Sequence, residues 1–277
     1  MASTATQTCY RHPNRETAVS CSNCGRPICP SCMTPTPVGM RCPECSAQKT
    51  QVRSLRTLSA NPTVTMALIA INVIAFLGSG QFGLGTQSGA NTLFSHGWLY
   101  GPDIAVGHDY WRLVTSGFLH VGFIHIGSNM YLLYVLGRML EPVLGNVRFA
   151  LLYGVSLLFG SFGALAFSPV AETVGASGAV FGMMGVAFFE LRNRGVDPMQ
   201  SGIGGLILIN LVLSFAISGI SIGGHIGGLI GGSLAILLLH ATDRMRKPLL
   251  GYAGLAVLAV IAVAGALAVA GNTSSII

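Results

Sequence analysis

The sequence predicts an all-α polytopic membrane protein that begins with a small Cys-rich domain. Of its 277 residues, 51% are hydrophobic and only 9% are charged, whereas soluble proteins carry about 25% charged residues. All seven cysteines precede position 46, and no long apolar run begins before Pro62. The chain therefore divides into a Cys-rich head and an apolar body.

Seven apolar stretches in the body are candidate membrane-spanning helices. They cover residues 63–79, 116–137, 149–168, 177–189, 202–217, 222–241 and 249–270. A helix needs about 20 apolar residues to cross a hydrocarbon core of about 30 Å. The helix expected from Ser177 to Phe189 is only about 20 Å long, so its N-terminus should lie below the membrane surface. The irregular segment before it, "SPVAETVGA", should then be buried in protein or line water.

Basic residues predict how the body is oriented in the membrane. A cytoplasmic N-terminus places only Arg112 on the outer side. The cytoplasmic set is Lys49, Arg53, Arg56, Arg138, Arg148, Arg192, Arg194, Arg244, Arg246 and Lys247. We therefore expect a multi-pass plasma-membrane protein with no signal peptide and an external C-terminus. This topology explains the net charge of +6, so no nucleic-acid partner is expected.

The head contains four pairs of metal-ligand residues, each pair separated by two residues. The pairs are Cys9/His12, Cys21/Cys24, Cys29/Cys32 and Cys42/Cys45. Eight such ligands suit two tetrahedral zinc ions. An odd number of cysteines in a reducing cytoplasmic head argues against disulfides. We expect a zinc-binding domain over residues 1–48 and a basic linker over 49–61 that lies along the anionic inner leaflet.

Two ways of pairing these ligands remain open. Only four residues separate Cys24 from Cys29, which is a short link for two pairs that bind the same ion. The second and third pairs are therefore expected to serve different ions. A cross-brace (first with third pair, second with fourth) resembles a B-box or RING-like module and is favoured over a sequential arrangement.

Three histidines in or beside the apolar stretches are candidates for function, because ionisable residues inside a membrane are rare. They are His120 and His125 near the start of the second stretch and His225 in the sixth. No Asp or Glu falls inside a stretch; Glu141, Glu190 and Asp243 fall at the expected cytoplasmic ends. Together with the lack of an internal repeat, this argues against a transporter or channel.

Glycines repeat at four-residue spacing around His225. They form two rows on one helix, Gly223, Gly227 and Gly231 in the first and Gly224, Gly228 and Gly232 in the second. Such rows let another helix backbone approach closely, and Gly178 and Gly182 offer a matching surface. If these surfaces pack, Ser177 and His225 stand at the outer ends of their helices at similar depth. A hydrogen bond between them is then expected.

Three further features favour catalysis at this place. The N–H groups at the helix start at Ser177 would stabilise a developing oxyanion. His125 and Asn129 are four residues apart and share a helix face, so they could add donors, whereas His120 is expected to order the preceding loop. Each residue alone is more often structural, but the joint pattern favours a serine–histidine site.

Five motifs resemble the rhomboid family of intramembrane serine proteases, in the family's order and over residues 62–245. They are "YWRLVTSGFLH", "HIGSN", "GRMLEPVLG", "GASG" and "GGH". The resemblance implies a six-helix bundle over 62–245, followed by a seventh helix and tail over 246–277. It also implies a dyad without a catalytic cofactor, with Ser177 as nucleophile and His225 as general base. His125, Asn129 and the Ser177 N–H would form the oxyanion hole.

The resemblance also assigns expectations to neighbouring residues and to the activity. Phe181 replaces a tyrosine that stacks on the histidine in some members, and Arg112 and Glu141 match structural positions. The expected activity is peptide-bond hydrolysis in or near the spans of membrane-anchored proteins. The alternative is a catalytically silent relative that binds transmembrane helices. A cytoplasmic protein partner for the head is a further expectation.

Overall fold

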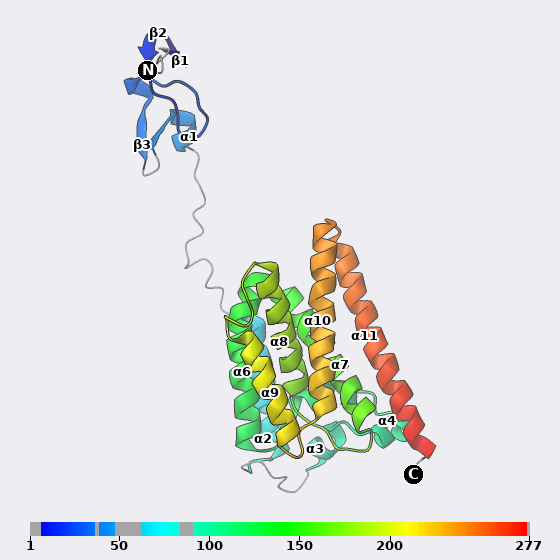
Figure 1. Cartoon of the computed structure of the whole chain (residues 1–277). Coiled ribbons are helices and arrows are strands. Elements are labelled where there is room, and N and C mark those ends of the chain that lie inside the picture. The colour runs from blue at the N-terminus through cyan, green and yellow to red at the C-terminus, as the bar shows by residue number, and fades with distance from the viewer. Residues whose placement is uncertain (1–6, 37–38, 48–61, 84–90, 276–277) are drawn as a thin grey trace. The chain divides into compact units, whose positions relative to one another are not determined.

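The computed structural model of the chain describes residues 7–36, 39–47, 62–83 and 91–275. The chain folds as two compact units, Met1–Leu58 and Ser59–Ile277 (Figure 1). The predicted basic linker, residues 49–61, lies outside the described residues.

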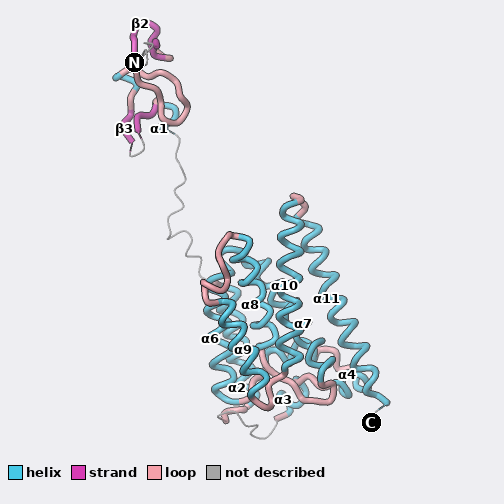
Figure 2. Tube along the Cα trace, in the orientation of Figure 1, coloured by secondary structure: helices cyan, strands magenta, loops and turns pink. Residues whose placement is uncertain are grey.

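The head unit contains two short antiparallel hairpins, drawn in magenta in Figure 2. In the first, β1 (Gln7–Cys9) pairs with β2 (His12–Thr17), and in the second, β3 (Thr34–Thr36) pairs with β4 (Gly39–Arg41). A 3-10 turn (Pro30–Cys32) and α1 (Pro43–Ala47) complete it. Its buried core consists of cysteines and Ile28. So few apolar groups rarely stabilise so small a domain without a metal or disulfides.

The second unit is almost entirely helical, and each of the seven predicted stretches overlaps one long helix. These helices are α2 (Thr63–Ser79), α6 (Gly122–Leu144), α7 (Asn146–Phe167), α8 (Ser177–Asn193), α9 (Ile203–Ala216), α10 (Ile222–Arg244) and α11 (Pro248–Gly271). Three short helices precede α6, namely α3 (Thr92–Gly97), α4 (Gly101–Gly107) and α5 (Arg112–Thr115), and a 3-10 turn (Asn272–Ser275) follows α11.

The length and apolarity of these helices confirm a multi-pass membrane protein. Among the described residues, α7, α10 and α11 are long and apolar enough to cross a membrane, and the bent pair Arg112–Phe118 with α6 would be a fourth. The apolar helices α2 and α9 are shorter. Seven crossings therefore stay a prediction.

The second stretch, predicted near residues 116–137, is not one continuous helix. The structure has a 3-10 turn over Ser116–Phe118 and begins α6 only at Gly122, after a bend of 96°. Leu119 and Val121 are extended, and Gly122 has a φ of +77° that favours glycine. These conformations stop helix propagation, so His120 lies in the bend rather than on the helix.

The two glycine rows of α10 pack against two different helices. A Cβ on Gly228 would lie 1.9 Å from the backbone oxygen of Gly178 in α8. A Cβ on Gly227 would lie 2.3 Å from the backbone oxygen of Phe159 in α7. The predicted packing on Gly178 and Gly182 of α8 is thus present for one row, Gly224, Gly228 and Gly232. The other row packs against α7 and consists of Gly223, Gly227 and Gly231. In Figure 1, α7 and α8 lie beside α10.

Glu141 of α6 caps the N-terminus of α2. Its carboxylate accepts from the backbone N–H groups of Val64 and Thr65, each at 2.8 Å, and from the Thr65 hydroxyl at 2.6 Å. The residue before α2, Pro62, provides no side-chain cap. Because the first N–H groups of a helix lack intrahelical acceptors, a carboxylate from a neighbouring helix stabilises this end.

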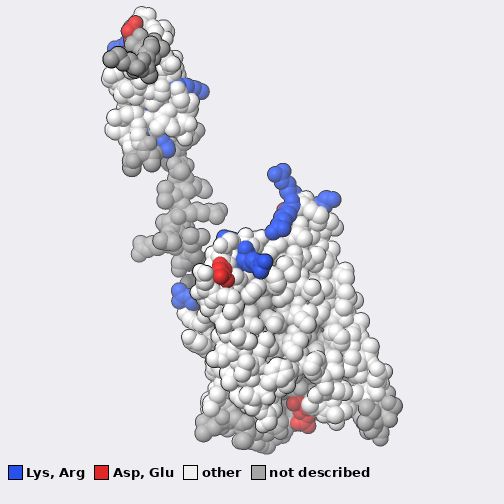
Figure 3. Space-filling view, viewed as in Figure 1, with Lys and Arg blue, Asp and Glu red and all other residues white. Residues whose placement is uncertain are grey.

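Charged side chains gather at the end of the unit where α8 and α10 end (Figure 3). Arg148, in the first turn of α7, pairs with Asp243 of α10 at 2.6 Å. Glu190 of α8 lies 2.7 Å from both Arg194 Nε and His240 Nε2. These contacts join three helices at one end, opposite the starts of α8 and α10.

Candidate active site and metal centres

Ser177 is the first residue of α8 and is half-buried. The segment before it is irregular, as expected, and is held by backbone hydrogen bonds. Thr173 forms a bridge with Leu99, and the Gly175 N–H donates to the Ser116 carbonyl at 2.9 Å. Gly175 has a φ of +128°, a conformation that side chains oppose. These hydrogen bonds therefore hold Ser177 in a fixed position beside the bend before α6.

His125, in the first turn of α6, lies on the other side of Gly175. A Cβ on Gly175 would be 2.7 Å from His125 Nε2 and 3.6 Å from Ser177 Oγ. Glycine is thus the residue that lets the imidazole approach the hydroxyl. A donor at His125 Nε2 would lie near any oxygen bound at Ser177, which is the requirement for an oxyanion site.

Among the described residues, no hydrogen bond joins Asn129 of α6 to Ser177. Its amide nitrogen donates to the His125 carbonyl, one turn earlier on α6, at 2.9 Å. An amide nitrogen carries two hydrogens, so this bond leaves one donor for another partner. The role of Asn129 in an oxyanion hole stays a prediction.

His225 lies in the first turn of α10 and is held by two neighbours. The ring of Phe181, four residues after Ser177 on α8, stacks on the imidazole with centroids 4.0 Å apart and planes 16° apart. His225 Nδ1 lies 2.6 Å from the hydroxyl of Ser214 in α9. The structure records no hydrogen bond between the described side chains of Ser177 and His225. Catalytic hydrogen bonds are often long without substrate, so that bond also stays a prediction.

Two neighbours of the site make contacts that hold it, and only one of them was expected from the sequence. Ser214 is a small polar residue within the apolar stretch 202–217, and nothing in its spacing points to His225. His120 was expected to order the preceding loop, and its Nε2 accepts from the Ala176 N–H at 3.3 Å. The ring of this fully buried histidine also packs on His125, with centroids 4.9 Å apart. His120 therefore links the bend before α6 to the residue before Ser177.

A small pocket opens beside Ser177, between α7, α8 and α10. It is lined mainly by small residues, including Ser116, Gly160, Val174 and Gly224. The arrangement offers a half-exposed hydroxyl beside space for a small group.

Arg112 stabilises the segment between α2 and α6. Its guanidinium is 3% exposed and pairs with Asp103 at 2.8 Å and Asp109 at 2.9 Å. It also donates to the carbonyls of Ser95 and Trp98. A buried arginine with all these partners is structural, in agreement with the position that it matches in the resemblance.

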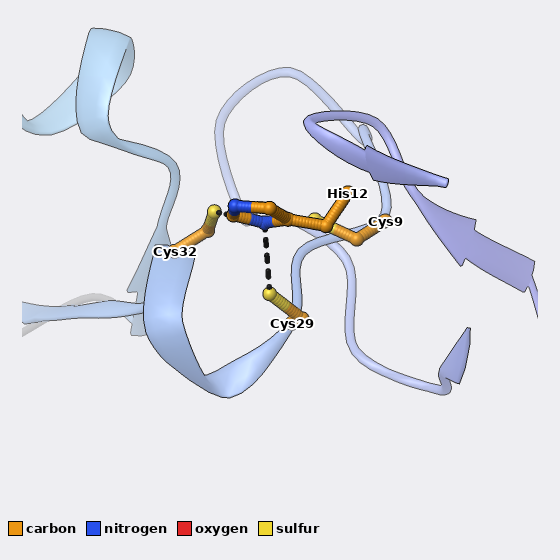
Figure 4. A group of neighbouring side chains, drawn as sticks. All are labelled: Cys9, His12, Cys29 and Cys32. Carbon is orange, nitrogen blue, oxygen red and sulfur yellow. Dashed lines mark hydrogen bonds between the residues drawn. The ribbon is translucent and has the colours of Figure 1, made fainter. Parts of the chain in front are cut away.

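The head brings its ligand residues into two clusters. One contains Cys9, His12, Cys29 and Cys32 (Figure 4), and the other contains Cys21, Cys24, Cys42 and Cys45. In each, the ligand atoms lie within 4.8 Å of one another. The first pair thus lies with the third and the second with the fourth, which is the cross-brace arrangement.

The distances in these clusters fit a tetrahedral zinc ion. Bonds of about 2.3 Å to sulfur and 2.0 Å to nitrogen place two sulfurs about 3.8 Å apart and a sulfur and nitrogen about 3.5 Å apart. Cys24 Sγ lies 3.8 Å from Cys42 Sγ, and His12 Nδ1 lies 3.4 Å from the sulfurs of Cys29 and Cys32. Burial and the neighbouring Cys29 raise the pKa of Cys32 to about 11. A bound cation reverses such a shift because it binds the thiolate.

Comparison with known proteins matches residues 107–242 to the Rhomboid domain family. Rhomboid protease GluP of Bacillus subtilis is 36% identical over 184 residues, which cover 65% of this chain and 36% of GluP. The rhomboid YdcA of the same organism is 36% identical over 134 residues, which cover 47% of this chain and 67% of YdcA. Rhomboid-like protease 1 of Toxoplasma gondii is 33% identical over 167 residues, which cover 57% of this chain and 56% of that protein. The match spans less than two thirds of the first and third of these relatives.

Proposed function

This chain belongs to the rhomboid family, and from that premise we propose that it is an intramembrane serine endopeptidase. It hydrolyses peptide bonds in or near transmembrane segments of membrane proteins. The observation that carries the proposal is the stack of Phe181 on His225. Because Phe181 follows Ser177 by one helical turn, this contact holds the imidazole against the helix that starts with the nucleophile. All three of these relatives have the word protease in their names, which supports the same chemistry.

The proposed reaction is acyl transfer by a serine–histidine dyad. His225 takes the proton of the Ser177 hydroxyl as Oγ attacks the scissile carbonyl. The Ser177 N–H, His125 and Asn129 donate to the oxyanion of the tetrahedral intermediate. His225 then gives its proton to the leaving amine, and a water that it deprotonates hydrolyses the acyl-enzyme. The chain needs no cofactor for these steps.

We further propose that the active site opens toward the outer side of a plasma membrane, with a cytoplasmic N-terminus and an external C-terminus. Support comes from the cations at the opposite end of the unit, such as Arg148, Arg194 and Arg244. The proposed domains are 1–48 for the head, 62–245 for the protease core and 246–277 for the last helix and tail. Substrate helices must unwind to expose a carbonyl, so helix-breaking and small residues are expected near the cleavage site.

For the head we propose two structural zinc ions in a B-box-like cross-brace. The support is the match of the two clusters to tetrahedral distances and the scarcity of other core residues. The ion would be held by four protein ligands in each cluster, which leaves no open position for catalysis. A cytoplasmic partner for the head stays a prediction.

The test is cleavage of a fluorescent transmembrane substrate by the full chain in proteoliposomes. We expect Ser177→Ala and His225→Ala each to lower kcat at least about 1000-fold, with loss of fluorophosphonate labelling in Ser177→Ala. Ser168→Ala, in the exposed loop before α8, is the matched control and should cleave normally. Full activity in Ser177→Ala contradicts the proposal. Binding of transmembrane helices by a wild type that cleaves nothing supports the silent alternative.

A further inference from the structure

We infer that Ser214 of α9 is a positioning residue that fixes the tautomer of His225. This inference rests on the proposed function, since it concerns the base of the same site. Ser214 does not touch the reacting atoms; it acts only through the imidazole.

The hydrogen-bond geometry at Ser214 allows one consistent assignment of protons. Its Oγ lies 2.7 Å from the Asn210 carbonyl, one turn earlier on α9, and 2.6 Å from His225 Nδ1. A hydroxyl has a single hydrogen, and a carbonyl oxygen can only accept. The Ser214 hydroxyl donates its hydrogen to the Asn210 carbonyl, so the hydrogen between Ser214 Oγ and His225 Nδ1 must come from the imidazole. His225 is therefore protonated on Nδ1, and Nε2 is left with a free lone pair.

This tautomer is the one that general-base catalysis requires. The nitrogen that takes the serine proton must be unprotonated, and in a three-residue triad a carboxylate at the other ring nitrogen enforces this. Among the described residues, no Asp or Glu is bonded to His225, and its Nδ1 partner is Ser214. The same hydroxyl keeps accepting from Nδ1–H when Nε2 becomes protonated.

The contact is protected from competition by water. Ser214 is 2% exposed and His225 is 6% exposed. Phe181 covers one face of the imidazole while Ser214 binds its edge. Phe181 thus fixes the plane of the ring and Ser214 fixes its rotation, and no hydrogen bond to Nε2 is recorded among the described residues.

The surroundings of Ser214 argue against a packing role. Within α9 the buried residues are Ile203, Gly204 and Ser214. The neighbours of Ser214 point outward, with Leu213 43% and Phe215 65% exposed. A polar residue is therefore the buried side chain in the last turn of a mostly apolar helix. Burying a hydroxyl has a cost unless its hydrogen bonds are made, and His225 supplies one of them.

The experiment compares Ser214→Ala with Ser156→Ala in the proteoliposome cleavage assay. Ser156 of α7 is equally buried and makes the same bond to a carbonyl one turn earlier, that of Leu152, at 2.7 Å. Among the described residues, no hydrogen bond joins Ser156 to His225. We expect Ser214→Ala to lower kcat about tenfold, the effect of one hydrogen bond, with KM unchanged. Ser156→Ala should keep kcat within about twofold.

A spectroscopic measurement separates tautomer control from a general loss of fit. Nitrogen NMR of protein labelled at its histidines reports which ring nitrogen is protonated. The signals of His225 are identified as those that disappear in His225→Ala. They should show a protonated Nδ1 in the wild type and the loss of that preference in Ser214→Ala. Wild-type kcat in Ser214→Ala, or protonated Nε2 in the wild type, overturns the inference. If Ser177→Ala is inactive in that same assay, the proposed function stands and only the role of Ser214 fails.

Discussion

The ring of Phe181 lies flat against the ring of His225, with 4.0 Å between centroids. Phe181 belongs to α8 and His225 to α10, and the two helices approach at Gly178 and Gly228 without intervening side chains. The helix that begins with Ser177 therefore also sets the plane of the imidazole. Four predictions follow, two from this packing, one from the cap that Glu141 provides to α2 and one from the ligand clusters of the head.

Replacing Phe181 by leucine should impair turnover more than folding. Leucine keeps an apolar contact but removes the ring stack, which contributes about 0.5–1.5 kcal/mol. We expect kcat for the transmembrane substrate to fall about two- to tenfold. The control is Phe149→Leu in α7, where an equally buried ring is lost at the charged end. Equal losses of kcat in both variants would show that the stack has no specific role.

Replacing Gly228 by alanine should destabilise the membrane unit. The new Cβ would lie 1.9 Å from the Gly178 carbonyl oxygen, so α8 and α10 must move apart. Overpacked cores lose about 1–3 kcal/mol, which thermal unfolding in detergent can measure. Gly154→Ala in α7 is the control, because nothing lies within 4 Å of its Cβ and alanine favours the helix. A Gly228→Ala protein as stable as Gly154→Ala would contradict this packing.

Replacing Glu141 by alanine should loosen the start of α2. The change removes the acceptor of two backbone N–H groups and of the Thr65 hydroxyl. Loss of a helix cap costs about 0.5–2 kcal/mol, and charged acceptors lie at the upper end of that range. The measurement is the unfolding midpoint, with Glu172→Ala in an exposed loop as the control. An unchanged midpoint in Glu141→Ala would mean that solvent replaces the cap.

Elemental analysis of the head should find two zinc ions per chain, and Cys32→Ser should lose one of them. The second cluster shares no ligand with the first, so its ion should remain. Acidification should release both ions, because thiolate and neutral imidazole bind the metal and protons compete for them. Ser31→Ala, beside Cys32, is the control and should retain both. No zinc in reduced, unchelated wild type, or one ion held jointly by both clusters, would refute the cross-brace sites.

The sequence alone predicted the membrane class, the places of the long helices and the ligand pairs of the head. These features depend on composition and on spacings within a few neighbouring residues, which fix apolar run length and local geometry. The motifs around Ser177 and His225 likewise carry their information in short segments. Family membership follows from such segments and not from the fold.

Other features depend on contacts between residues far apart in the chain. Only the tertiary structure decided that Cys9 clusters with Cys29 rather than with Cys21, and that the glycine rows of α10 face two different helices. It also placed Ser214 on His225. No local pattern specifies which helix faces receive one another, because that choice is made by backbone approach and side-chain volume across the whole bundle.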